Sequence, residues 1–157
     1  MSGVDIAPSM IQLANKYNKK PRRCRFYLNE NSDLSLFSDN YFNFIYTNMV
    51  LQHMEPRFSK KYLAEFIRIL APEGVLVFQL PSELVSKKNT ISTLRSMFVN
   101  IYYKMKYWLG GREMEMYGVP KDQIIDFLEQ KNVRILDIQP NDNAGKRWTN
   151  FTYYIIK

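Results

Sequence analysis

The chain has 157 residues, which is enough for one domain with a single core. Its formal charge of +7 allows either an anionic partner or nothing more than solubility. With a single cysteine the chain cannot form an internal disulfide. One cysteine and one histidine are too few ligands for a zinc site. The first twenty residues lack an apolar signal core, and no apolar run approaches a membrane span. We therefore expect a soluble, cytoplasmic protein with no membrane partner.

Short strands alternate with helices in the first half of the chain. Residues 2–5 form the end of a short strand, and Pro8 suits the first position of the helix that follows. Residues 25–28 are the next strand, beside which we expect Cys24 to be a small buried group. The aromatic and aliphatic run at residues 43–48 predicts an interior strand whose carboxyl end carries polar groups.

A helix and a buried strand come next. Ser59 is expected to cap a helix with one apolar stripe, and residues 71–74 contain the Pro and Gly that stop it. The nearly continuous apolar run at residues 75–80 is typical of a strand covered on both faces. This alternation predicts an α/β fold with a doubly wound, mostly parallel sheet.

The segment of residues 81–118 interrupts that alternation within what we expect to be one domain, residues 1–157. It keeps helical spacing but is rich in Tyr, Met and Trp, and Gly110-Gly111 provides a hinge or a helix stop. Three interpretations remain open: a helix packed on the core, a lid over a ligand site, or an amphipathic surface for a membrane or partner.

The C-terminal part predicts a helix followed by two strands. Pro120 starts the helix, and Asp122 lies in its first turn, where a negative charge is favourable. Residues 133–138 and 148–156 are the strands, with no helical segment between them. They are therefore expected to pair as an antiparallel hairpin.

A basic turn at residues 18–25 is the one dense charge cluster. It holds five Lys and Arg side chains around Pro21, without interleaved aromatic residues. A solvated turn explains it better than a phosphate or nucleic-acid patch, because stacking platforms are missing. Nucleic acid is therefore the weakest of the candidate partners.

Several motifs, in this order and spacing, resemble the class I S-adenosylmethionine-dependent methyltransferases. The sequence GVDIAPSMIQLAN is similar to the family's acidic second-strand motif and the helix after it. The stretch SDLSLFSDNYFNFIYTNMVLQHM resembles the approach to the fourth strand, and EFIRILAPEGVLVFQLPS the next helix and fifth strand. The resemblance implies a Rossmann-like fold with a C-terminal antiparallel hairpin, and S-adenosylmethionine as the cofactor.

The resemblance also implies which residues bind the cofactor: Asp5, Ile6, Glu30, Asn31, Thr47, Asn48 and Met49. Asp5 corresponds to the carboxylate that holds both ribose hydroxyls, with Ile6 flanking the adenine. Glu30 or Asn31 corresponds to the position that binds the adenine amino group. Asp5 is alternatively a helix-start carboxylate, and Glu30 and Asn31 are alternatively parts of a polar turn.

One departure from the family affects the centre of the predicted sheet. The family's first strand and its GxGxG loop have no counterpart among the six glycines of this sequence. In the family that strand lies between the second and the fourth. The first strand is therefore expected to be missing, so that either the sheet closes up or two edges stay exposed. Exposed edges invite pairing with another copy of the chain.

Methyl transfer from a sulfonium mainly requires alignment and exclusion of water, which agrees with the absence of a nucleophile triad. If the acceptor must lose a proton, the only histidine, His53, is the candidate catalytic base; a structural role in shaping its loop is the alternative. We expect a methyltransferase acting on a small molecule. The rival hypothesis is a methyltransferase-like module that does not bind the cofactor and serves as a binding or assembly partner.

Overall fold

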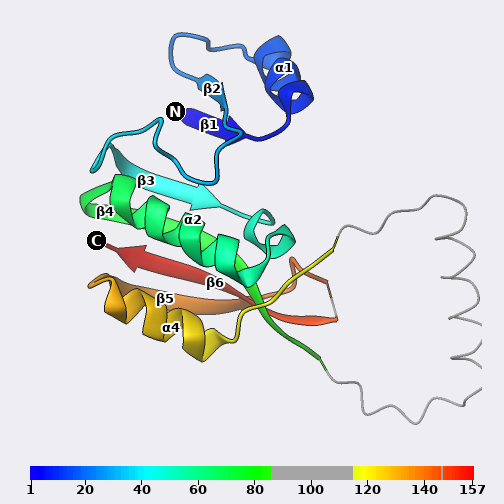
Figure 1. Ribbon diagram of the computed structural model, residues 1–157, viewed down its shortest axis with the longest axis vertical. Coiled ribbons are helices and arrows are strands. Elements are labelled where there is room, and N and C mark those ends of the chain that lie inside the picture. The colour runs from blue at the N-terminus through cyan, green and yellow to red at the C-terminus, as the bar shows by residue number, and fades with distance from the viewer. Residues whose placement is uncertain (86–114, 146) are drawn as a thin grey trace, which may run out of the picture.

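The computed structural model describes residues 1–85, 115–145 and 147–157, which form two neighbouring sheets with helices packed on them (Figure 1). The elements are β1 (Ser2–Asp5), α1 (Pro8–Tyr17), β2 (Arg25–Leu28), β3 (Phe42–Thr47), the 3-10 turn η1 (Leu51–His53), α2 (Pro56–Ile69), β4 (Leu70–Leu84), α4 (Lys121–Gln130), β5 (Arg134–Asn141) and β6 (Trp148–Ile156). The predicted α/β class, mostly parallel with a C-terminal antiparallel hairpin, is confirmed.

The smaller sheet consists of β1 and β2, which pair in parallel with α1 packed beside them. Pro8 begins α1, as predicted, because its fixed φ suits the first helical position and its missing N–H is not needed there. Gly3 is required in β1, since a Cβ at this position would lie 2.7 Å from the Phe26 ring. None of the residues of α1 is buried.

The larger sheet has the strand order β3-β4-β6-β5. β3 runs parallel to β4, whereas β6 runs antiparallel to both β4 and β5. Among the described residues, β1 pairs only with β2 and β3 only with β4. The sheet therefore does not close up. Besides the outer edge strands β2 and β5, β1 and β3 therefore each keep an open edge among the described residues, and β1 is the strand of the smaller sheet that lies toward β3 in Figure 1.

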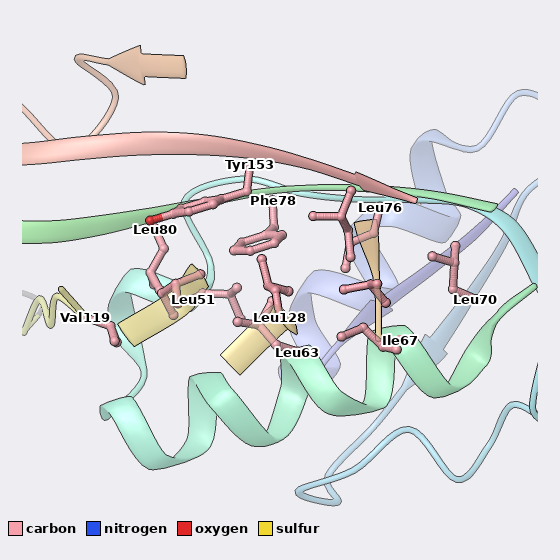
Figure 2. Packing of buried hydrophobic residues seen from close by; sticks show 13 residues of the cluster. Leu51, Leu63, Ile67, Leu70, Leu76, Phe78, Leu80, Val119, Leu128 and Tyr153 are labelled. Atoms are coloured by element: carbon pink, nitrogen blue, oxygen red, sulfur yellow. The ribbon is translucent and has the colours of Figure 1, made fainter. Parts of the chain in front are cut away.

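The main core lies between the larger sheet and the helices α2 and α4, which cover one of its faces (Figure 2). Phe78 of β4 and Tyr153 of β6 stack with ring centroids 4.7 Å apart, and Leu63 of α2 and Leu128 of α4 pack in the same cluster. All four side chains are fully buried. The other face of the larger sheet is more exposed to solvent, since Phe44 and Tyr46 of β3 are 60% and 63% exposed.

A second, smaller cluster joins the β2–β3 connection to α2. Leu34 and Phe37 are buried against Ile69 at the end of α2. Arg68 stabilises this contact by donating to the carbonyls of Leu34 and Phe37, at 3.0 and 3.1 Å. Glu65 holds Arg68 in place and also accepts the Leu34 N–H at 2.8 Å. The long connection before β3 is thereby fixed to the main body.

Two local predictions were wrong. Ser59 does not cap α2, because the helix already begins at Pro56 and the Ser59 hydroxyl instead donates to the Pro56 carbonyl at 3.1 Å. Cys24 is half-buried rather than buried, since it lies in the turn before β2 and not under a helix.

The predicted insert or lid falls mostly outside the described residues. Its described ends are the last residues of β4 and a stretch from Glu115 that returns along the sheet. There the Val119 N–H donates to the Pro81 carbonyl at 2.9 Å, and Gly118 lies against Ser82 and Trp148. The chain thus enters α4 from beside β4. In the described ranges no helix is long and apolar enough to cross a membrane.

Candidate functional site

A groove of about 410 Å³ lies beside the carboxyl ends of β1 and β2, and the end of η1 and the first turns of α2 line its other side. Four of the residues predicted for the site line it: Ile6 after β1, Glu30 and Asn31 after β2, and His53 after β3. Ligands of open α/β sheets bind outside the carboxyl ends of parallel strands. The groove therefore has the position that a cofactor or substrate site requires in this fold.

Asn29 shapes the part of the groove that follows β2. Its side chain is 5% exposed and donates to the Asp33 carbonyl at 2.7 Å, which closes the turn. Glu30 and Asn31 are exposed on this turn, and the Asn31 carbonyl accepts the Tyr62 hydroxyl at 3.2 Å. The turn is thus tied to α2, and both candidate adenine-binding side chains face solvent at the groove.

Asp5 ends β1 immediately before Ile6. Its Oδ1 accepts the N–H of Ala7, the residue before α1, at 2.8 Å, so the carboxylate closes the turn between β1 and the helix. The half-buried carboxylate has further acceptor positions, so one such bond is compatible with a second partner.

His53 uses both ring nitrogens to bind neighbouring segments. Nδ1 lies 3.0 Å from the Glu115 carbonyl, and Nε2 lies 3.1 Å from the Gln52 amide nitrogen. Because a carbonyl can only accept, Nδ1 carries the proton and Nε2 accepts from Gln52. These contacts favour the structural role, since Nε2 must leave Gln52 before it can take a proton from an acceptor.

Thr47, Asn48 and Met49 follow one another at the carboxyl end of β3, but they do not line the groove. Thr47 and Asn48 are half-buried, whereas Met49 is 49% exposed. Of the predicted cofactor residues, Ile6, Glu30 and Asn31 line the groove. Asp5, at the end of β1, and Thr47–Met49, at the end of β3, do not.

The charge of the groove is opposite to that of the whole chain. Three carboxylates line it, those of Glu30, Glu55 and Glu115, and no Lys or Arg is among its described lining residues. Glu55 is partly neutralised by Arg57 at 3.0 Å, on the exposed rim. The chain's net charge of +7 is thus concentrated elsewhere, and this groove favours a cationic ligand group.

Two tyrosines complete the wall. Burial raises the pKa of Tyr62, whose hydroxyl is held on the turn after β2. The Tyr117 hydroxyl donates to the Glu115 carboxylate, and this bond raises the pKa of Tyr117, because losing the proton would leave two anions in contact. Both phenols therefore stay neutral at neutral pH.

Sequence reasoning missed several lining residues. They are Ser32, Met54, Glu55, Phe58, Tyr62, Glu115 and Tyr117. Phe58 and Tyr62 are four residues apart on α2; the sequence marked Tyr62 only as part of the helical stripe, and Phe58 preceded the predicted helix. Glu115 and Tyr117 reach the groove through a long-range contact, the Tyr117 N–H donating to the Gln52 carbonyl at 2.8 Å. No local pattern indicates that contact.

Comparisons with known proteins agree with this geometry. Residues 1–78 match the family described as "Methyltransferase domain". A SAM-dependent methyltransferase from Methanosarcina mazei superimposes with a TM-score of 0.67 at 16% identity, over 99% of this chain and 81% of the other. No curated protein matches the sequence.

Two further similar structures contain S-adenosylhomocysteine. The 1,6-didemethyltoxoflavin-N1-methyltransferase of Burkholderia thailandensis has a TM-score of 0.61 and 17% identity, over 99% of this chain and 60% of that one. The magnesium protoporphyrin IX methyltransferase of Synechocystis has a TM-score of 0.63 and 11% identity, over 99% and 63%. The chain thus carries a methyltransferase domain over residues 1–78, and its fold is that of S-adenosylmethionine-dependent methyltransferases.

Proposed function

We propose that this chain forms the greater part of a methyltransferase that moves the methyl group of S-adenosylmethionine to a small-molecule acceptor. The observation that carries the proposal is the groove beside the ends of β1 and β2, which brings Ile6, Glu30 and Asn31 together with His53. Two similar enzymes act on small molecules according to their names, which supports that acceptor class.

The chemistry of the groove suits the cofactor. A sulfonium carries a positive charge, and the carboxylates and aromatic rings of the groove favour such a group. The sulfonium supplies the electrophilic methyl group when bound, and the protein has to orient the acceptor and exclude water. Phe58, Tyr62 and Tyr117 provide apolar surface for the second task.

Titration calorimetry with S-adenosylmethionine tests this proposal. We expect binding to the unmodified chain, and a roughly tenfold weaker affinity for Asp5→Asn, because a charged hydrogen-bond acceptor is lost. Asp126→Asn, an exposed carboxylate of α4 away from the groove, is the matched control and should leave affinity unchanged. Absence of detectable heat at millimolar cofactor would reject cofactor binding by this chain alone.

The second candidate function is an assembly module without cofactor binding. The specific observation in its favour is the pair of open edges on β1 and β3, which have no strand partner among the described residues. Phe44 and Tyr46 expose large apolar side chains beside one of them. An open edge with apolar neighbours is a template for pairing, and a second copy of this chain is the partner that we propose.

Light scattering on a sizing column tests the assembly function. We expect a mass above that of one chain, and a return to one chain in Tyr46→Lys, because a charge beside an edge opposes strand pairing. Leu136→Lys on the far edge strand β5 adds the same charge to a side chain of similar exposure, 49%, and serves as control. A single-chain mass for the unmodified protein at high concentration would exclude this assembly.

A further inference from the structure

Met49 has a backbone conformation that its side chain does not favour. Its φ of +60° lies in the left-handed region, which glycine adopts freely but which costs energy in residues with a Cβ. Met49 stands two residues past β3, at the strand end predicted to face the cofactor. Such strain persists only where surrounding contacts maintain it, and it is frequent at functional sites.

Gln79 of β4 makes the contact that maintains this conformation. Its Oε1 accepts the Met49 N–H at 2.9 Å. Because a backbone N–H can only donate, this bond fixes the orientation of the Gln79 amide. Gln79 is 2% exposed in a strand that is otherwise apolar at this point, where burying an amide is unfavourable unless all its bonds are made.

The remaining bonds of Gln79 connect the strand end to other elements. Its Nε2 donates to Gln52 Oε1 at 3.1 Å and to Asn150 Oδ1 at 2.5 Å. Gln52 in turn binds His53, which lines the groove. One buried amide thus holds the end of β3, the η1 turn and the hairpin strand β6 together.

The β5–β6 hairpin closes this network into a ring. The Asn150 amide donates to Asn141, and the Asn143 N–H donates to the same Asn141 Oδ1 at 3.0 Å. The side-chain amide of Asn143 then donates to Asn48 Oδ1 at 3.4 Å. Both residues that follow β3, Asn48 and Met49, are therefore held by amide side chains from elements that carry none of the predicted cofactor residues.

We propose that Gln79 is a positioning residue: it stabilises the left-handed Met49 and thereby sets the direction of the chain at the carboxyl end of β3. The conformational part stands on the contacts alone. Its consequence for the cofactor rests on the proposed function, because Thr47–Met49 are only predicted to face that ligand. Gln79 touches neither cofactor nor acceptor in this scheme and acts only through Met49.

A double-mutant cycle with thermal unfolding tests the conformational part. Gln79→Met keeps a similar volume without the polar atoms, and we expect it to lower Tm by about 5 °C or more. Adding Met49→Gly should recover at least half of that loss, because glycine keeps a positive φ without the Gln79 contact. Should Gln79→Met fail to fold, recovery of folding by Met49→Gly would support the proposal, and no recovery would overturn it.

The matched control uses another residue with positive φ. Asn132 has a φ of 54° after α4 and belongs to no contact of Gln79, so Asn132→Gly should add independently to Gln79→Met. Hydrogen exchange gives a second readout: the Met49 amide should exchange at least tenfold faster in Gln79→Met, with amides in the middle of β4 unchanged. Additive Tm effects with an unchanged Met49 amide would overturn the proposal.

Cofactor affinity separates this inference from the proposed function. If the unmodified chain binds S-adenosylmethionine, Gln79→Met should weaken binding several-fold and Met49→Gly should partly restore it. Unaltered affinity in Gln79→Met would overturn the link to the cofactor. If the unmodified chain does not bind, the proposed function fails, while the cycle still decides whether Gln79 holds Met49.

Discussion

The two sheets of the molecule differ in pairing and in packing: the smaller one is a single parallel pair, whereas the larger one adds an antiparallel hairpin to a parallel pair. β1, α1 and β2 contain no buried residue. The larger sheet shares a continuous buried cluster with α2 and α4, of which Figure 2 shows 13 residues. Met10, Leu13 and Tyr17 of α1 are instead 45–67% exposed. Side-chain burial therefore contributes less to the smaller sheet, where Tyr27 of β2 packs against the Leu34 and Phe37 cluster, than to the larger one.

This difference matters because the candidate site draws on both sheets. Asp5, Ile6 and Glu30 belong to the thinly packed unit, whereas Met49 and His53 belong to the well-packed one. The two halves are joined through the cluster of Leu34, Phe37 and Ile69 and through the Arg68 contacts. The geometry of the groove thus depends on elements that contain no buried residue.

Hydrogen exchange should reveal the largest contrast. Amides in β4 and β6 open only with the whole core, whereas β1 and β2 have little buried surface to resist local opening. We expect protection in the larger sheet to exceed that in the smaller one by roughly a thousandfold. Equal protection in both sheets, measured residue by residue by NMR, would show that they unfold as one unit and would remove the contrast.

Paired leucine substitutions test the same contrast through stability. Leu63 on α2 is fully buried, so Leu63→Ala should reduce the free energy of unfolding by about 2–5 kcal/mol. Leu13→Ala on α1 removes the same atoms from a side chain that is 45% exposed and should cost less than about 0.5 kcal/mol. Denaturant unfolding measures both, and comparable losses would contradict the view of α1 as weakly packed.

The stability contributed by the Glu65–Arg68 contact, which helps to join the two halves, should depend on pH. The Arg68 hydrogen bond holds the pKa of Glu65 below its ordinary value, with the Leu34 N–H adding to the effect. A lowered folded-state pKa contributes stability that is present above the unfolded pKa and lost as pH falls through the folded one. Glu65→Gln should therefore cost about 1–2 kcal/mol at pH 7, and this cost should decline as pH falls below the ordinary Glu pKa and vanish below the lowered folded-state pKa.

The control for Glu65→Gln is Glu129→Gln on α4, whose carboxylate is exposed. We expect Glu129→Gln to change the free energy of unfolding by less than about 0.5 kcal/mol at any pH. A pH-independent cost of Glu65→Gln would mean that shape, and not the Arg68 contact, explains the role of Glu65.

The sequence alone was sufficient to predict those elements whose bounds depend on a local pattern. The bounds of β2 and β6 and the start of α1 at Pro8 agree with the predictions, because alternation and proline geometry act over a few residues. Ser59 was misassigned because Pro56, which starts the helix one turn earlier, was taken as part of a loop. Ser59 and Pro56 are both local signals for a helix start, and α2 begins at Pro56.

The site was predicted only in part, for a physical reason. Ile6, Glu30 and Asn31 follow strand ends, which a motif can locate along the chain. Tyr117 reaches the groove through its N–H, which donates to the Gln52 carbonyl. The two residues lie far apart in the sequence, and no periodicity encodes this contact. The role of Gln79 could not be predicted either, since one amide within an apolar run does not indicate which three residues it will bind.

The smallest expected effect concerns one buried hydroxyl in the well-packed half. Tyr153 is fully buried, and within the described part of the chain its hydroxyl has no hydrogen-bond partner. An unpaired buried polar group lowers stability, so Tyr153→Phe should raise the free energy of unfolding by about 1 kcal/mol. Tyr154→Phe, next along β6 with an exposed hydroxyl 3.4 Å from Gln139, is the control and should have almost no effect.

The difference in free energy of unfolding between Tyr153→Phe and the unmodified chain should increase at alkaline pH. Burial, with a smaller contribution from Asp122, raises the pKa of Tyr153 above its ordinary value. A raised folded-state pKa gives stability that is present below the unfolded pKa, about 10, and lost as pH rises through the folded one. The unmodified chain should therefore lose stability above about pH 10 faster than Tyr153→Phe. If the substitution instead destabilises the protein at neutral pH, the hydroxyl has a partner, and a bound water would be the simplest one.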